Sequence, residues 1–317
     1  MEFIFHRPSG ARVCDKLFYK DLRLVVLEND ALRVVVAPEK GCDIVSFVDK
    51  ASGVDIMLRL PMGLRSLKSE RSLLPLPNTF SSFYEGGWQE LFPTASGFGK
   101  YYGQDQPIHG EVFLLPWDYA IIEDSASRVC VEFRVRTVLS PFELKRRMIL
   151  DASSPEVRFE ESIENLSGVD INYMWGHHPA FGAPFLSGDC RIELPKSRLF
   201  QGDETALKIP PETEPRSVMM YAMDLERGIY GLKNERMGLG FGMKWDHRLF
   251  SKIWIWQSMH SIEGSPYFGR EYACAIEPFT SLPHQLYGKQ DPLPVIRGRQ
   301  KIETSLSAFL YRGALPK

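Results

Sequence analysis

The feature that most constrains the fold of this chain is an alternation of apolar and polar side chains with a period of two residues. On one face of residues 129–139 lie Val129, Val131, Phe133, Val135, Thr137 and Leu139, and on the other Cys130, Glu132, Arg134, Arg136 and Val138. In residues 156–163, Val157, Phe159 and Ile163 stand opposite Arg158, Glu160 and Ser162. Successive side chains of a strand point to opposite faces, so both segments predict half-buried strands. No window sustains the 3.6-residue period of a helix.

Strand signals recur along the rest of the chain. Residues 22–27 and 31–37 are rich in β-branched side chains and flank a short turn, which predicts a hairpin. Further strands are expected at 43–48, 237–245, 252–257, 272–277 and 301–311. The glycines of 237–245 form one face, where another sheet or a ligand can approach closely. The longest helix candidate, Gly63 to Arg71, is short. Many strands with closely spaced turns favour a large antiparallel sandwich or barrel.

The composition limits the classes of protein and of partner. A chain of 317 residues that is 44% hydrophobic can bury one large all-β core or two ordinary ones. Without a shift in composition or a repeat, we interpret residues 1–317 as a single domain. The net charge of -2 indicates neither nucleic acid nor an anionic membrane surface as a partner. The five cysteines form no Cys-x-x-Cys pair, and Cys130 and Cys274 lie in strand-like runs typical of buried thiols.

We expect no targeting segment in this chain. The N-terminal residues have no apolar signal core, and no run reaches the roughly 18 apolar residues that a membrane span requires. We therefore expect a cytoplasmic protein with no membrane partner.

The segment 175–182 contains two of the chain's seven histidines, His177 and His178. Histidine exchanges a proton near neutral pH. Pro179 fixes its own φ angle and favours an extended backbone at His178. The flanking glycines permit turns, which predicts a stiff platform at a strand end. Because adjacent residues of an extended chain point in opposite directions, we expect one histidine to act in chemistry and the other to be structural.

A candidate base follows from the strand predicted at 272–277. If Tyr272, Cys274 and Ile276 face the core, Glu277 shares the opposite face with two alanines, at the edge of an open floor. Pro278 is expected to end the strand and restrain the carboxylate. Apolar neighbours should hinder solvation of Glu277, raise its pKa and make it a usable base.

The stretch 77–118 is long and irregular, which inside a compact domain is often a functional property. It contains His109 within Pro-Ile-His-Gly-Glu, the amide of Gln89, and two tryptophans, Trp88 and Trp117. Flat aromatic faces beside amide and histidine groups suit a sugar, although packing in the core explains either tryptophan equally well. With His178 and Glu277, His109 also fits a metal site of two histidines and one carboxylate, but no local ligand pair supports it.

The chain resembles the aldose 1-epimerase (galactose mutarotase-like) family in three ordered segments. These are Gly87-Trp88-Gln89-Glu90-Leu91-Phe92-Pro93 followed by His109-Gly110 and Trp117, then Gly176-His177-His178-Pro179-Ala180-Phe181, then Ile276-Glu277-Pro278. Alignment on Phe181 places the family histidine at His178. The resemblance implies a β-supersandwich of antiparallel strands with an open sugar-binding face. It also implies mutarotation of a small-molecule sugar without a cofactor.

By the resemblance, Glu277 removes the proton of the anomeric hydroxyl and His178 protonates the ring oxygen. His109 would hold a hydroxyl group or the ring oxygen. We expect the two catalytic groups to face one cleft, with room for a pyranose ring between them. An adjacent carboxylate favours the charged imidazole, so Glu277 should also raise the pKa of His178.

The chain departs from the family pattern at two binding residues. Residues 94–108 contain no arginine, so Arg65 is the expected substitute, and Asp246 or Asp224 is the expected sugar-binding aspartate. The predicted substrate-binding set is His109, Trp88, Gln89, Trp117, His177, Arg65 and Asp246. These departures suggest a divergent branch. Two alternatives stay open, a non-catalytic carbohydrate-binding protein and a metal-dependent sugar isomerase or lyase.

Overall fold

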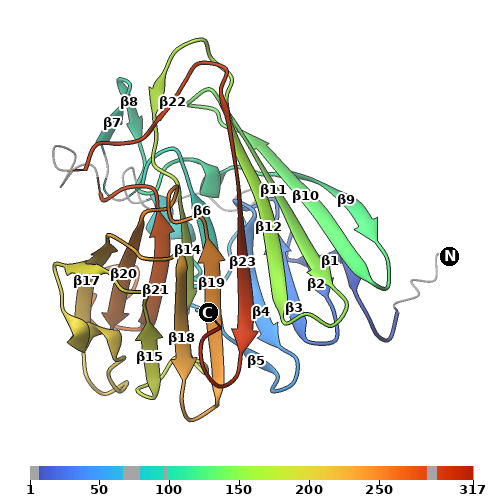
Figure 1. Cartoon of the computed structure of the whole chain (residues 1–317), viewed down its shortest axis with the longest axis vertical. Helices are drawn as coiled ribbons and strands as arrows, with labels where there is room; N and C mark the ends of the chain where they lie inside the picture. The colour runs from blue at the N-terminus through green and yellow to red at the C-terminus, as the bar shows by residue number, and fades with distance from the viewer. Residues whose placement is uncertain (1–6, 67–78, 96, 98, 284–290, 317) are drawn as a thin grey trace.

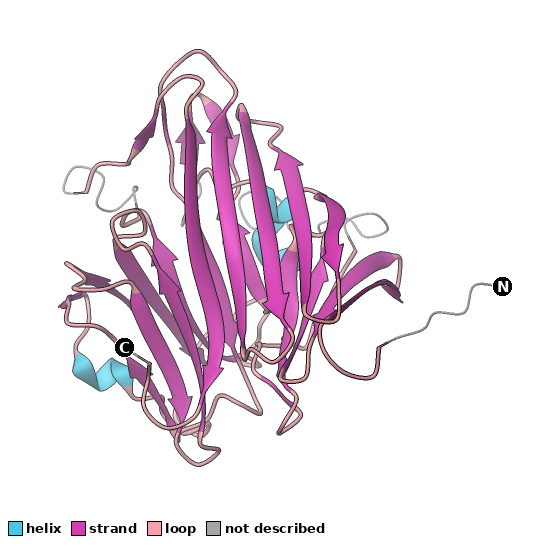
Figure 2. Ribbon diagram, turned by 45° about the vertical axis from the view of Figure 1, so that its right-hand side comes forward, coloured by secondary structure: helices cyan, strands magenta, loops and turns pink. Residues whose placement is uncertain are grey.

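The computed structural model describes residues 7–66, 79–95, 97, 99–283 and 291–316. Antiparallel β-strands dominate it (Figures 1 and 2). The larger sheet has eleven strands. In sheet order they are β1 (Arg12–Tyr19), β2 (Leu22–Glu28), β3 (Leu32–Ala37), β4 (Asp43–Asp49), β6 (Trp88–Leu91), β14 (Gly176–Phe181), β21 (Tyr272–Phe279), β20 (Lys252–Met259), β17 (Arg216–Met223) and β16 (Arg198–Phe200), with β5 (Val54–Asp55) beside β4.

The second sheet has eight strands and packs against the first. In sheet order they are β15 (Cys190–Glu193), β18 (Ile229–Asn234), β19 (Leu239–Trp245), β23 (Lys301–Tyr311), β12 (Glu156–Asn165), β11 (Phe142–Asp151), β10 (Arg128–Arg136) and β9 (Asp118–Asp124). Two small sheets pair β13 (Ile171–Asn172) with β22 (Val295–Ile296) and β7 (Gly99–Tyr101) with β8 (Gln104–Gln106). The helical elements are α1 (Thr79–Phe83), η1 (Val112–Leu114) and η2 (Glu204–Leu207).

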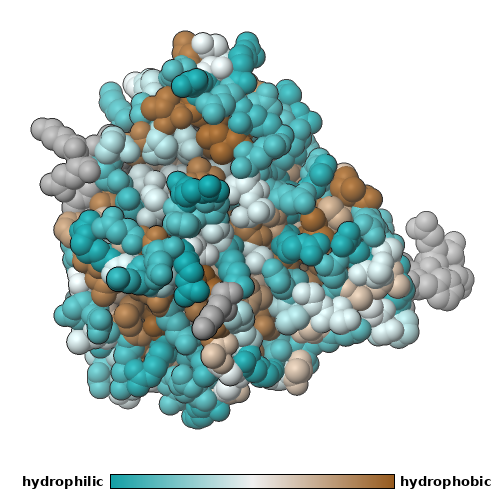
Figure 3. Space-filling view, in the orientation of Figure 1, coloured by the Kyte–Doolittle hydropathy of each residue, from teal (hydrophilic) through white to brown (hydrophobic). Residues whose placement is uncertain are grey.

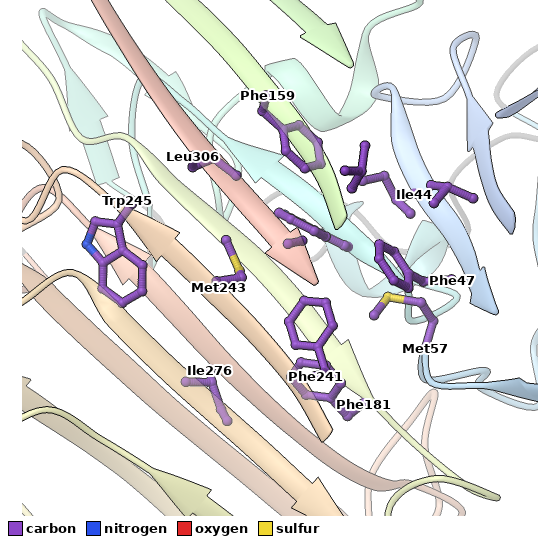
Figure 4. Close-up of a cluster of buried hydrophobic side chains, with 14 of the residues drawn as sticks. Ile44, Phe47, Met57, Phe159, Phe181, Phe241, Met243, Trp245, Ile276 and Leu306 are labelled. Atoms are coloured by element: carbon purple, nitrogen blue, oxygen red, sulfur yellow. The ribbon is translucent and has the colours of Figure 1, made fainter. Parts of the chain in front are cut away.

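The main hydrophobic core lies between the two large sheets. Figure 4 shows side chains from both of them meeting there, including Phe47 and Phe181 from the larger sheet and Phe159 and Phe241 from the smaller. All four are fully buried, and burial of such a side chain typically stabilises a fold by about 1.5–3 kcal/mol. We call the face of the eleven-stranded sheet that points away from this core its outer face. The molecular surface in Figure 3 is mostly hydrophilic, with apolar groups scattered over it.

The structure confirms the hairpin at 22–37 and the inward faces of β10 and β12. Val129, Val131 and Phe133 are fully buried. However, β10 ends at Arg136, earlier than the alternation suggested, and Leu139 is 46% exposed. The hydroxyl of Thr137 accepts a hydrogen bond from the Phe142 amide, which forms the turn into β11.

Several further expectations can be compared with the structure. The glycines of β19 make room for aromatic rings of the neighbouring strand, since a Cβ at Gly240 would collide with Tyr311 and one at Gly242 with Phe309. In the expected helix Gly63–Arg71, residues 63–66 are not helical, and residues 67–71 lie outside the described part of the chain. Cys130 and Cys274 are buried free thiols, as predicted. Among the described helices, none has the length and apolar character needed to cross a membrane.

Candidate active site

The segment Gly176–Phe181 forms β14, a central strand of the larger sheet, and not the predicted turn platform. It runs between β6 and β21 (Figure 1). Gly176 is required because the ring of Phe279 occupies the space where a Cβ would lie. Strand geometry then points His177 and His178 to opposite faces. His177 faces the core and His178 lies on the outer face.

His178 and Glu277 meet on the outer face. The strand pairings Gly176–Phe279 and Ala180–Ala275 flank them, so the two residues lie opposite each other on β14 and β21. The imidazole Nε2 is 3.6 Å from the carboxyl Oε1. Their exposed fractions are only 4% and 2%. This direct contact corrects the expectation that a pyranose ring fits between the two groups.

The predicted alternation in β21 is correct, but the expected end of the strand is not. Cys274 and Ile276 join the main core, whereas Ala273 and Ala275 belong to a second apolar cluster on the outer face. The strand continues through Pro278 to Phe279. The row of small side chains beside Glu277 is fully buried, so the floor is covered rather than open.

Aromatic rings cover His178. Tyr84 lies 5.5 Å away between ring centroids, Phe80 of α1 6.1 Å, His109 5.6 Å and Trp256 6.2 Å. His109 has a φ of 70°, in the left-handed region, which brings its ring to 4.5 Å from Phe80. The structure therefore brings His109, His178 and Glu277 together beneath one apolar cover.

Burial controls the proton affinities in this enclosure. It raises the pKa of Glu277 well above its ordinary value and lowers the pKa of His178 to about 4. It also lowers the pKa of His109 well below its ordinary value, and the neighbouring His178 adds to this effect. The predicted rise for Glu277 is confirmed. The predicted rise for His178 is wrong, because desolvation of the imidazolium outweighs the backbone hydrogen bond that opposes it. Both shifts favour a neutral imidazole and a protonated carboxyl.

Gln89 extends this arrangement on β6. It pairs in register with His178, so both side chains share the outer face. Its amide nitrogen donates to Asp43 Oδ2 at 3.2 Å and to the Gly86 carbonyl at 2.6 Å. Both amide hydrogens are thereby used, which fixes the side chain and defines Oε1 as an acceptor.

His177 lies on the core side within a buried polar network. Its Nε2 is 3.1 Å from Glu161 of β12. Arg146 of β11 bonds Glu161 at 2.8 Å and also pairs with Glu90, which accepts from the Trp175 indole at 2.7 Å. This network joins the two sheets, so we leave His177 out of the ligand-facing residues.

Trp88 and Trp117 also lie on the core side. Trp88 is fully buried and packs 5.2 Å from Phe159 of the opposite sheet. Trp117 is 3% exposed, donates from its indole to the Val112 carbonyl at 3.2 Å, and lies beneath Arg146. This placement corrects the expectation that they line a sugar site: both complete the interior packing.

Arg65 and Asp246, which were predicted to serve as the sugar-binding arginine and aspartate, lie in different parts of the molecule. Arg65 donates to the Ser82 carbonyl at 2.7 Å and covers the ring of Phe83, so it lies against α1, which supplies part of the cover. Asp246 follows β19 of the smaller sheet and binds Arg248 at 2.9 Å, away from His178. The other aspartate considered, Asp224, pairs with Arg198 at the edge strand β16. Neither aspartate belongs to the candidate site.

Sequence reasoning missed the cover residues Phe80 and Tyr84 and the charged residues Lys40, Asp43 and Glu85 beside Gln89. The one usable signal was that Tyr84 and Glu85 lie directly before Gly86 and Gly87, where the first of the three family-like segments begins. Within the described residues, no group of three or more histidine, cysteine or acidic side chains is placed to hold a metal ion.

The two packed antiparallel sheets have the galactose mutarotase-like fold. A protein of Klebsiella pneumoniae with the provisional name aldose 1-epimerase matches with a TM-score of 0.79 and 14% identity, over 95% of this chain and 83% of that chain. A galactose mutarotase-like protein of Clostridium acetobutylicum matches with a TM-score of 0.67 and 15% identity, over 96% and 99%. Another from Lactobacillus casei matches at 0.63 and 15%, over 91% and 100%.

The family follows from the sequence itself. The chain belongs to the family described as a domain of unknown function, DUF4432, whose model matches residues 21–307. No curated protein matches the chain.

Proposed function

We propose that this chain is a sugar mutarotase that interconverts the α and β anomers of a monosaccharide. The observation that carries the proposal is the buried contact between His178 and Glu277 on the outer face of the larger sheet. Opening a sugar ring requires one group that accepts a proton and one that donates it. A neutral imidazole beside a protonated carboxyl supplies both within one pair. The similarity of fold to mutarotase-like proteins supports the same reading.

The protonation of the pair suggests the order of proton transfers. His178 takes the proton of the anomeric hydroxyl, and Glu277 gives its proton to the ring oxygen as the bond from C1 to that oxygen breaks. The open-chain aldehyde rotates about C1–C2. On closure, the Glu277 carboxylate takes the proton back from the C5 hydroxyl, and the imidazolium returns one to the oxygen on C1. This order reverses the roles implied by the family resemblance, because burial favours the protonated carboxyl of Glu277 and the neutral imidazole of His178.

Substrate entry requires movement of the cover. Both groups are at most 4% exposed, and the rings of Phe80 and Tyr84 lie over the imidazole. Displacing these rings admits water or sugar and lets the pair reach the ring atoms. Closure afterwards excludes solvent, which strengthens the electrostatic interactions that stabilise the transition state. The five free cysteines suit a reducing compartment such as the cytoplasm, where we place the reaction.

The test is anomer interconversion measured by polarimetry on freshly dissolved D-glucose, D-galactose and D-mannose. We expect acceleration of at least one sugar, and a loss of about 10²–10⁴ in rate for Glu277→Gln. Glu271→Gln is the matched control, because Glu271 is also fully buried but bonds Ser258 and two loop amides. Sugar binding with unaccelerated interconversion would favour the non-catalytic carbohydrate-binding alternative.

A further inference from the structure

A second buried polar group lies beside the catalytic pair. We call Lys40, Asp43, Glu85 and Gln89 the Lys40 cluster. The Lys40 ammonium pairs with the Asp43 carboxylate and lies 2.7 Å from Glu85. Gln89 bonds the same Asp43 at 3.2 Å. The four side chains are buried, with Glu85 the most exposed at 6%. The proposed acid–base chemistry uses none of their charges.

Several oxygen atoms of this cluster have no hydrogen-bond partner among the described residues. They are Asp43 Oδ1, Gln89 Oε1 and Glu85 Oε1, whereas Glu85 Oε2 pairs with Lys40. A buried acceptor without a partner is costly, and such atoms in a native structure call for a ligand or water. Buried atoms without a partner in the described part of the chain also occur in structural networks, for example Gln257 Oε1 and Glu271 Oε2, but three of them gather in this cluster.

The open acceptors are within reach of a sugar bound at the catalytic pair. Gln89 is the register partner of His178, and neighbouring strands are about 4.8 Å apart. Asp43 lies one hydrogen bond further from His178. On the outer face, Glu277, His178, Gln89 and Asp43 therefore follow one another in a line across four strands. The part of this line from Glu277 to Gln89 covers two strand spacings, about 10 Å, which is the length that a pyranose ring with its substituents requires.

The cluster is also close to solvent on its far side. Glu85 lines a groove of about 910 Å³ on the outer face of β1 to β4, together with Val26, Val35 and Leu58. The groove thus reaches the cluster without passing through the aromatic cover over His178. A sugar suits this boundary, because its C–H groups can contact the apolar side chains of the groove while its hydroxyl groups donate hydrogen bonds to the buried acceptors.

We propose that the Lys40 cluster is a hydroxyl-binding subsite that selects aldoses with a hydroxyl group on C2. The inference rests on the proposed mutarotase function. With His178 at the oxygen on C1 and Glu277 at the ring oxygen, the next substituent on the side away from Glu277 is the C2 hydroxyl. That hydroxyl donates to Gln89 Oε1. Asp43 and Lys40 are positioning residues that hold the Gln89 amide in this orientation.

The experiment compares each parent sugar with its deoxy analogue. We would measure kcat/KM for D-glucose, D-galactose and D-mannose, and for 2-deoxy-D-glucose, 2-deoxy-D-galactose and the 6-deoxy sugar of each. For wild type we expect about tenfold lower kcat/KM for the 2-deoxy sugars, the loss typical of one hydrogen bond, and little change for the 6-deoxy sugars. We call the ratio of kcat/KM for the parent sugar to kcat/KM for its 2-deoxy analogue the 2-deoxy penalty. Gln89→Met keeps the length of the side chain and removes the acceptor, so this ratio should fall towards one.

Controls separate this subsite from a purely structural role. Asp43→Asn should reduce the penalty in the same direction, whereas Glu271→Gln should leave it unchanged even if its melting temperature falls. The subsite proposal would be overturned if the 2-deoxy penalty were unchanged in both Gln89→Met and Asp43→Asn while both variants remained folded. It would also be overturned if the wild type discriminated against the 6-deoxy sugars and not against the 2-deoxy sugars. Neither result would contradict the proposed mutarotation. No acceleration of any sugar by wild type would remove both proposals.

Discussion

His177 and His178 are neighbours in the chain but lie on opposite faces of the same sheet. His177 is 3.1 Å from Glu161 of the opposing sheet, and His178 is 3.6 Å from Glu277 on the neighbouring strand. One imidazole therefore belongs to the network that joins the sheets, and the other to the candidate acid–base pair. This separation leads directly to a test in which two adjacent substitutions have different effects.

His178→Asn should remove activity with a small change in stability. His177→Asn should lower stability with a small change in activity. Loss of the proton acceptor lowers the rate by about 10²–10⁴. Loss of His177 leaves Glu161 with one partner fewer in the core and lowers the melting temperature. Paired measurement of mutarotation rate and thermal unfolding checks both. An inactive but stable His177→Asn would reverse the assignment.

The mutarotation rate should follow a bell-shaped pH profile. The acid limb reflects protonation of His178, whose pKa is lowered to about 4 by burial. The alkaline limb reflects ionisation of Glu277, whose pKa burial raises well above its ordinary value. Only between these limits does the pair hold one proton, so activity should extend well below pH 6. A rate that falls steeply on acidification through pH 6.5 would contradict the proton assignment.

Glu85 should make the fold less stable as the pH rises. Burial raises its pKa from 4.5 to about 8, although Lys40 opposes the shift. A carboxyl with a higher pKa in the folded state contributes stability that is complete below its unfolded pKa and is lost as the pH rises through the folded value. We therefore expect the free energy of unfolding to decline between about pH 4.5 and 8. Urea unfolding across this range should show a shallower decline for Glu85→Gln; an equal slope would contradict the prediction.

Arg146→Met should destabilise the fold strongly. The guanidinium is 1% exposed and neutralises Glu90 and Glu161 between the sheets. Removal of one partner from a buried ion pair typically costs about 3–5 kcal/mol, because the remaining charges stay desolvated. Equilibrium unfolding in urea measures this loss. The triple change Arg146→Met, Glu90→Gln and Glu161→Gln removes the charges together and should recover part of it.

The strands and their buried faces could be predicted because a period of two is a local property. The alternation in β10, β12 and β21 identified which side chains face the core. For β6 the same reasoning fails: Trp88, Gln89, Glu90 and Leu91 are all buried, and nothing local shows that the tryptophan faces the core and the amide the outer face. Only the pairing with β14 settles this orientation.

The environment of the site depended on contacts distant in sequence. Phe80 and Tyr84 cover His178 from almost 100 positions earlier in the sequence. Phe80 belongs to a helix of five residues that is too short to show a helical period, and Tyr84 directly follows that helix. Their burial of the imidazole is what lowers its pKa. Lys40 and Glu85 likewise meet only because β4 and β6 are neighbours in the sheet.

The opposite orientations of His177 and His178 also restrict how this chain can diverge. Within β14 each position belongs to one face, and a deletion or insertion of a single residue would exchange the two faces for every residue beyond it. A shifted strand would turn the interior histidine to the outer face and the candidate acid–base histidine into the core. Related sequences should therefore keep the length of this segment constant, with length changes confined to the loops that enter and leave it.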